Sequence, residues 1–181
     1  DMSTNGGGWT LAMRFDPTSS TFTFNSPYWT DTNTLDASNL DPDDPSDGKF
    51  SSYDLIEGDE IQGCFVSGCV SYVLPQSQSL YTLFVDPPSG SDTAGTGGLC
   101  FSESQSDRLH WSSIMNLSTS NASTSANYVR TGINIDDDVS CYDARVRFGL
   151  VLNNEGDINT LNDAAGFGAS AYYSSSCDYA L

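Results

Sequence analysis

The chain has 181 residues and a formal net charge of −18, because 24 acidic residues accompany only 6 basic ones. A nucleic-acid-binding protein needs clustered Lys and Arg to displace counterions from phosphates, so this charge excludes that class. No apolar run approaches the roughly 20 residues of a membrane-spanning helix, which excludes membrane insertion. The chain is still 38% hydrophobic and 12% aromatic, so it is able to bury a core, and we expect a single domain over residues 1–181.

The first part of the chain predicts strands separated by polar loops. Apolar and polar residues alternate over 9–15 and 21–24, which predicts a strand in each stretch. Residues 41–48 hold two prolines and four aspartates, a composition typical of a loop. Two further strands are predicted at 60–66 and 69–74.

The linker between these last two strands is short enough for a hairpin. Such a hairpin sets Cys64 near Cys69 across the turn. The apolar run over 79–85 is typical of either a strand or a short helix, and residues 86–98 predict a Pro/Gly-rich loop.

Residues 145–152 form the clearest candidate for a buried strand, whereas residues 166–176 are rich in Gly, Ser and Tyr and are expected to be irregular. Together these segments predict a β-rich α+β fold with a twisted antiparallel sheet, long loops and few short helices.

The cysteines indicate an oxidising, extracellular compartment. None of them has the C-x-x-C spacing of a zinc or redox site, so disulfides are the better interpretation. The hairpin favours a Cys64–Cys69 pair. One arrangement of several then joins Cys100 to Cys141 and leaves Cys177 for a cysteine outside the chain or in a neighbouring subunit.

Two N-glycosylation sequons support the same compartment. They place acceptors at Asn116 and Asn121, inside a Ser/Thr-rich stretch typical of a solvated loop. An unmodified polar loop is the alternative.

Two stretches resemble one protein family. Residues 1–11 (DMSTNGGGWTL) and residues 147–155 (RFGLVLNNE) resemble fibrinogen C-terminal-like domains, above all those of intelectins, the X-type lectins. The resemblance implies a fibrinogen-like fold, a cysteine directly before Asp1, and a calcium-dependent glycan site near the Asn-Asn-Glu turn. It covers about one-fifth of the chain, and the middle matches poorly.

The residues after the second stretch predict a Ca²⁺ site in their own right. Calcium prefers six to eight oxygen ligands, and mixed carboxylate and amide side chains on a loop after a rigid strand supply them. An acidic surface turn is the alternative. The candidate ligands are Asn153, Asn154, Glu155, Asp157, Asn159 and Asp163.

The chain departs from the intelectin pattern beyond this point. Intelectins use a His-containing acidic loop and a second Glu, whereas no Glu or His follows Glu155 here. Tyr172 and Tyr173 are candidates for stacking on a sugar, and half-buried core residues are the alternative. Calcium is therefore expected to persist as a structural ion even where sugar binding does not.

Other charged groups have simpler interpretations. Two acidic groups are candidates for a second calcium ion or for solvated loops: the aspartates at 41, 43, 44 and 47, and the loop Asp136-Asp137-Asp138. Arg145 and Arg147 are expected to pair with aspartates nearby. The only histidine, His110, accompanies no catalytic signature, so we expect no enzyme.

The sequence thus predicts an extracellular, calcium-stabilised recognition or adhesion module that binds a glycan or a partner protein. The alternative is a structural subunit that self-assembles into an extracellular filament, hair or coat. Three observations favour this alternative: the missing sugar-binding loops, the unpaired fifth cysteine and the Ser/Thr-rich stretch.

Overall fold

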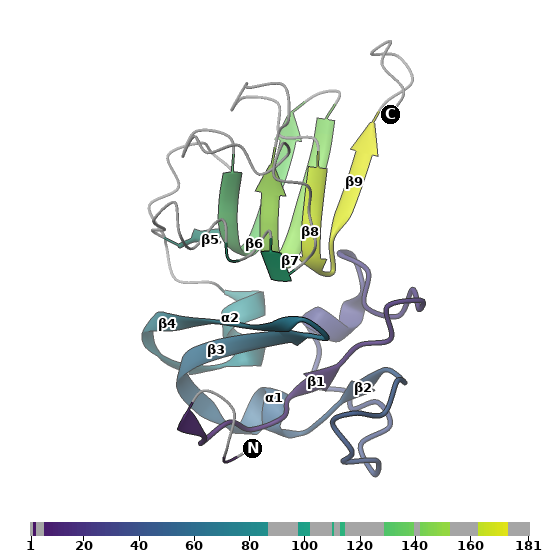
Figure 1. Cartoon of the computed structure of the whole chain (residues 1–181), viewed down its shortest axis with the longest axis vertical. Coiled ribbons are helices and arrows are strands. Elements are labelled where there is room, and N and C mark those ends of the chain that lie inside the picture. Colours follow the sequence, from purple (N-terminus) through teal and green to yellow (C-terminus); the bar gives the residue numbers. More distant parts are fainter. Residues whose placement is uncertain are drawn as a thin grey trace.

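A computed structural model describes residues 2, 6–86, 98–101, 110, 113–114, 129–139, 142–152 and 163–173. These residues form three antiparallel sheets with few short helices, which confirms the prediction of a β-rich α+β fold. In Figure 1 the largest sheet stands above a β-hairpin and two short helices. Within the described residues, no helix is long and apolar enough to cross a membrane.

The N-terminal part is mostly turns around buried aromatic rings. The strand β1 (Met13–Arg14) pairs with β2 (Gly48–Lys49), so only two residues of the strand predicted over 9–15 are paired in a sheet. The prediction of a strand over 21–24 is wrong. Residue Ser26 donates its amide to the Thr23 carbonyl in a turn, and the alternation arises because Phe22 and Phe24 are both buried.

A 3₁₀-helix, η2 (Pro27–Trp29), follows this turn. It buries Trp29, whose indole nitrogen donates to the Thr23 carbonyl at 2.8 Å.

The second sheet is the predicted hairpin. Strand β3 (Glu57–Phe65) pairs with β4 (Gly68–Ser79), and the register places Cys64 directly opposite Cys69. The hairpin lies between the helices α1 (Ser52–Leu55) and α2 (Leu80–Val85) in the chain. Of the two structures predicted for 79–85, the helix is present, because the Ser79 hydroxyl accepts the Thr82 amide and caps its first turn.

The largest sheet is built around two long strands. Strands β6 (Val129–Val139) and β7 (Tyr142–Leu152) form an antiparallel pair, and β5 (Leu99–Cys100) extends it on one side. The predicted buried strand over 145–152 is confirmed as part of β7. On its other side β7 pairs with both β8 (Asp163–Phe167) and β9 (Ser170–Tyr173).

Two sequence-based expectations are corrected by this sheet. The three aspartates 136–138 lie within β6 and not in a loop. Residues 166–173, which were expected to be irregular, form the end of β8, a turn and β9. Gly166 and Gly168 adopt positive φ angles of 134° and 64°. These two glycines let the chain bend between β8 and β9 while both strands stay paired with β7.

Aromatic side chains join the hairpin to the largest sheet in one core. Phe167 of β8 stacks on Phe65 of β3, with ring centroids 4.7 Å apart, and on Phe148 of β7 at 6.0 Å. Gly63 makes room for this contact, because a Cβ atom there would lie 2.5 Å from the Phe167 ring. The same cluster reaches Phe15 and Trp29 from the N-terminal turns.

Candidate functional site

The structure brings together the two ends of the predicted calcium segment. Leu152, the last residue of β7, pairs with Asp163, the first residue of β8. Asp163 is half-buried, whereas Leu152 and the two residues before it are buried at 3% exposure or less. The segment between them therefore starts and ends at paired positions of the two hydrogen-bonded strands β7 and β8.

The other predicted ligands lie outside the described residues: Asn153, Asn154, Glu155, Asp157 and Asn159. So do the sequon asparagines Asn116 and Asn121 and the cysteines Cys141 and Cys177. Among the residues that are described, no group of three or more His, Cys, Asp or Glu side chains is arranged to hold a metal ion.

The structure does not bring the two predicted tyrosines to the calcium segment. Tyr172 pairs with Asp143 and Tyr173 with Tyr142, at the beginning of β7, whereas the calcium segment starts at the end of β7. From Asp143 to Leu152 the chain advances nine residues, or about 30 Å along an extended strand. Asp163, the predicted calcium ligand that the structure describes, and the two predicted sugar-stacking residues thus pair with opposite ends of β7.

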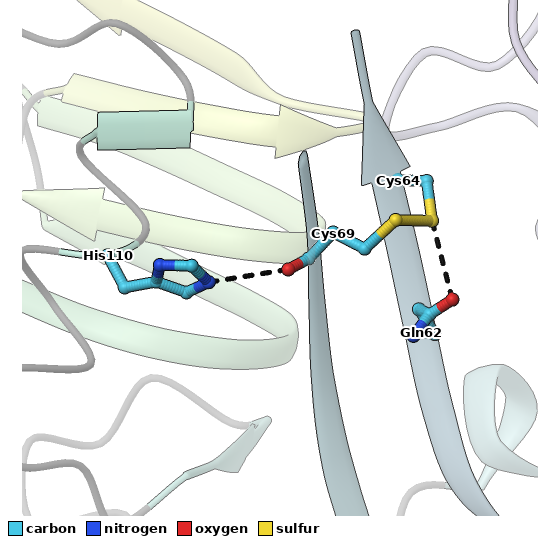
Figure 2. Close-up of a disulfide and its surroundings, with 4 residues drawn as sticks. All are labelled: Gln62, Cys64, Cys69 and His110. Carbon is cyan, nitrogen blue, oxygen red and sulfur yellow. Dashed lines mark hydrogen bonds between the residues drawn. A yellow bond between two sulfur atoms is a disulfide. The ribbon is translucent and has the colours of Figure 1, made fainter. Parts of the chain in front are cut away.

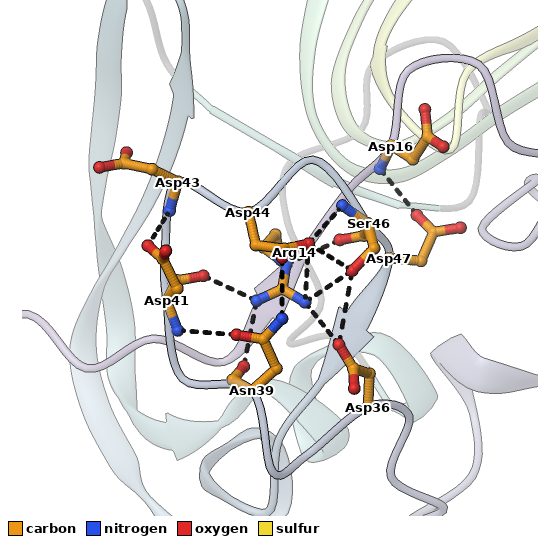
Figure 3. A network of polar contacts seen from close by, with 9 residues as sticks. All are labelled: Arg14, Asp16, Asp36, Asn39, Asp41, Asp43, Asp44, Ser46 and Asp47. Atoms are coloured by element: carbon orange, nitrogen blue, oxygen red, sulfur yellow. Dashed lines mark hydrogen bonds and ion pairs between the residues drawn. The ribbon is translucent and has the colours of Figure 1, made fainter.

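The Asp-rich loop 41–47 is organised by an arginine (Figure 3). Arg14, only 5% exposed, reaches from β1 into this loop. Its guanidinium donates to the carbonyl oxygens of Asp41 at 2.7 Å and Ser46 at 2.7 Å, and to the Asp36 carboxylate at 2.9 Å. The site considered for a second calcium ion already holds an internal cation.

Hydrogen bonds within this loop hold a carboxylate in its charged form. The hydroxyl and amide of Ser46 donate to Asp44 Oδ1 at 2.5 and 2.8 Å, and the Asn39 amide donates to Asp44 Oδ2 at 2.9 Å. These bonds, with a smaller contribution from Arg14, lower the pKa of Asp44 to about 2. Asp44 therefore stays ionised at neutral and mildly acidic pH.

Lys49, the only lysine, is also internal and is 1% exposed. Its Nζ donates to the carbonyl oxygens of Tyr28 and Asp31, both at 2.6 Å, and to the Asp31 carboxylate at 2.9 Å. It also lies 4.4 Å from the centre of the Tyr53 ring. The ammonium group is thus paired with a carboxylate and hydrogen-bonded to three protein oxygens. These contacts offset the free-energy cost of burying its charge.

The two arginines of β7 differ from each other. Arg145 forms an ion pair with Asp136 of β6 at 3.6 Å, as predicted. Arg147 donates to the Phe24 carbonyl and to the Asn134 side chain, both at 2.7 Å, and makes no ion pair with a carboxylate of the described side chains. The ring of Phe24 lies 4.4 Å from this guanidinium, so the groups seen in direct contact with Arg147 are neutral, although Asp136 also attracts its charge.

The basic side chains thus make contacts within the fold and do not form a charged surface patch in the described part of the chain. Five of the six basic residues are described, and none of them is exposed. Sequence reasoning missed the internal roles of Arg14 and Lys49. The available signal was their context, because each lies between apolar or small residues in an otherwise acidic region, Met13-Arg14-Phe15 and Gly48-Lys49-Phe50.

The predicted disulfide between Cys64 and Cys69 is present at the closed end of the β3–β4 hairpin (Figure 2). His110, which is exposed, points its Nε2 at the Cys69 carbonyl oxygen from 3.3 Å. Because a carbonyl only accepts, Nε2 carries the proton in this contact. The side chain of Gln62 lies at the other end of the disulfide, with its Oε1 3.4 Å from Cys64 Sγ.

Comparisons with protein-family models, with curated proteins and with solved structures find no match for this chain.

Proposed function

We propose that this chain is a non-catalytic extracellular recognition or adhesion module with an intelectin-like fold, stabilised by calcium at the β7–β8 connection. One observation carries the proposal: Leu152 and Asp163 are paired neighbours in the sheet. This pairing supports a calcium site because it closes an oxygen-rich segment at both ends. Ligands from the two ends then approach one ion at little cost in loop entropy.

The charge distribution supports the same proposal. All the basic side chains in the described part of the chain are buried or half-buried, while many of its carboxylates are exposed. A protein of net charge −18 is destabilised by its own repulsion unless counter-ions bind. A divalent cation at a cluster of carboxylates relieves that repulsion most effectively.

The calcium ion in this proposal is structural. Tyr172 and Tyr173 pair with the beginning of β7, far along the strand from the calcium segment. A glycan or protein ligand stacked on these tyrosines does not touch an ion held at the other end. We therefore propose that recognition at the tyrosines tolerates chelation of calcium as long as the fold persists.

Calcium titration of the chelator-treated protein tests the proposal. Melting is followed by circular dichroism, and binding by calorimetry. At free calcium 100 times its dissociation constant, ligand linkage predicts a stabilisation of about 2.7 kcal/mol. Asp163→Asn is expected to weaken calcium binding, whereas Asp59→Asn removes the same charge from an exposed position in β3 and should leave it unchanged. A melting curve that does not respond to calcium would contradict the proposed calcium site.

Recognition is tested separately on a glycan array and with extracellular-protein extracts. Binding that Tyr172→Ala and Tyr173→Ala abolish, with the fold retained, would support a ligand site on β9. A silent array would exclude glycans and leave a protein partner.

A structural subunit that self-assembles remains the second candidate. The observation in its favour is the exposure of aliphatic side chains next to and within the hairpin: Leu55 at 71%, Ile56 at 50% and Val73 at 76%. Exposed apolar groups of this kind are used in contacts between subunits. Electron microscopy of the purified chain with and without calcium tests it, and monodisperse monomers in both conditions would count against assembly.

A further inference from the structure

The Cys64–Cys69 disulfide is accessible, and it joins two strands that the hairpin turn already holds together. It joins directly opposite residues at the closed end of the β3–β4 hairpin and encloses only residues 65–68. Cys64 is exposed and Cys69 is half-buried. A disulfide that closes so short a loop removes less conformational entropy from the unfolded chain than one that closes a long loop.

Other contacts hold the same hairpin. Its inner face buries Ile61, Val70 and Leu74 at 6% exposure or less. At the tip, Phe65 stacks on Phe167, and the Ser67 hydroxyl donates to the Ile114 carbonyl. The register of the two strands is therefore set by packing and by backbone pairing, independently of the sulfur–sulfur bond.

We propose that Cys64–Cys69 is a site of thiol–disulfide exchange with an external thiol, and that the folded chain is the species that reacts. The incoming thiolate attacks the exposed Cys64 Sγ, a new sulfur–sulfur bond forms there, and the bond to Cys69 breaks. Cys69 leaves as a thiolate and takes a proton from water. When the reagent is a dithiol, its second thiolate then displaces Cys64, so the dithiol is oxidised and both protein cysteines end as thiols.

The exposure of the two cysteines assigns the attack to Cys64. Its sulfur belongs to the exposed member of the pair, and exchange depends on access of the thiolate to the sulfur that it attacks. Once a dithiol has reduced both cysteines, Gln62 Oε1, 3.4 Å from Cys64 Sγ, is placed to accept a weak hydrogen bond from the Cys64 thiol. This inference does not rest on the calcium site or on ligand recognition.

Differential alkylation of the native chain tests the proposal. Thiols already present are first blocked with one alkylating reagent. Glutathione is then added without denaturant, the reaction is quenched with acid, and peptides are mapped by mass spectrometry after a second, distinguishable alkylation. We expect glutathione on Cys64, the second alkyl group on Cys69, and an unchanged far-ultraviolet circular dichroism spectrum.

The rate separates reaction of the folded chain from reaction through unfolding. If exchange required global unfolding, it would be slower than in the denatured chain by about 10³-fold or more. We expect a difference of about tenfold or less, since the Cys64 sulfur is reached in the native state. The Cys64→Ser/Cys69→Ser variant controls for exchange at the remaining cysteines.

Three results would overturn the proposal. The first is a Cys64–Cys69 bond that stays intact until denaturant is added. The second is glutathione mapped mainly to Cys69, and the third is loss of the circular dichroism spectrum on reduction.

Discussion

Arg147 donates a hydrogen bond from Nη1 to Asn134 Oδ1 at 2.7 Å, and this pair connects three parts of the chain. The Asn134 side-chain amide donates to the Phe84 carbonyl at the end of α2, and Arg147 Nε donates to the Phe24 carbonyl in the N-terminal turns. Burial lowers the pKa of Arg147, yet a guanidinium remains charged in a protein at any physiological pH. Besides the aromatic contacts, one charged group and one amide thus join the largest sheet to α2 and to the N-terminal turns.

The backbone of Asn134 makes a specific prediction about substitution. Its φ of 52° lies in the left-handed region, which glycine and asparagine adopt more readily than alanine. Asn134→Gly should destabilise the fold by about 2 kcal/mol, from the loss of a hydrogen bond to a charged group. Asn134→Ala should cost about 3 kcal/mol, because backbone strain is added. Urea denaturation measures both, and equal effects would show that the left-handed conformation carries no cost.

Lys49 provides a second prediction, because removal of one partner of a buried ion pair leaves the other uncompensated. Lys49→Met should destabilise the fold by about 3 kcal/mol, since Asp31 then lacks its cation. The double variant Lys49→Met/Asp31→Asn should recover part of that loss, because no unpaired charge remains. Chemical denaturation of Lys49→Met, Asp31→Asn and the double variant forms a cycle that measures the coupling free energy between the two side chains. Additive effects would argue against a direct interaction.

Carboxylates with lowered pKa values, Asp44 and Asp31 among them, make the stability depend on pH. Asp44 has a pKa of about 2. Partial burial opposes ionisation of Asp31, but hydrogen bonds from Lys49 and Asn33 outweigh it and also lower the pKa of that group. A carboxylate with a lower pKa in the folded state stabilises the protein above its unfolded pKa, near 3.8 for aspartate, and that stabilisation is lost as pH falls through the folded value.

Comparison with Asp44→Asn isolates this effect from the general loss of negative charge in acid. The wild-type chain should be the more stable of the two above pH 4, and the difference should shrink as the pH falls toward 2. Denaturation midpoints over that range provide the measurement. The variant Asp59→Asn removes an exposed charge of β3 and controls for long-range repulsion. A difference that grows in acid would contradict the hydrogen-bond pattern around Asp44.

Two glycines of β3 form a matched pair for the contact between the hairpin and the largest sheet. A Cβ atom at Gly63 would lie 2.5 Å from the Phe167 ring and 2.7 Å from the Phe148 ring. At Gly58 the nearest atom would be 3.6 Å away, an ordinary contact. Gly63→Ala should therefore destabilise the fold by about 1–3 kcal/mol through overpacking, and Gly58→Ala should have little effect. Thermal melts compare the two, and similar melting temperatures would mean that the aromatic rings move aside easily.

Local patterns were sufficient for the hairpin and for β7. In the stretch RVRFGLVL one side of an extended chain is entirely apolar (Val146, Phe148, Leu150 and Leu152), which is typical of a strand with one face in the core. The short linker after Phe65 closes a hairpin, and this closure alone places Cys64 beside Cys69. Such features depend on residues close in sequence, so the amino-acid pattern alone is enough to predict them.

The segment 21–24 and the aspartates 136–138 show where local patterns mislead. Phe22 and Phe24 are both buried, yet the turn that holds them is stabilised by Trp29, which lies further along the chain. Three successive aspartates are typical of a loop by composition. They are tolerated in β6 because Arg145 of the neighbouring strand pairs with Asp136, and this partner follows from the register and not from proximity in sequence.

By itself the sequence determined the strongly acidic character, the β-rich class and the hairpin disulfide, because composition and short-range periodicity control these properties. Only the tertiary structure decided how the charges are used. It placed Arg14 inside the Asp-rich loop, buried Lys49 with Asp31 as its ionic partner, and paired Asp163 and the two tyrosines with opposite ends of β7. These arrangements depend on strand register and on contacts between residues far apart in the chain, and the free energy of such contacts has no signature in local sequence.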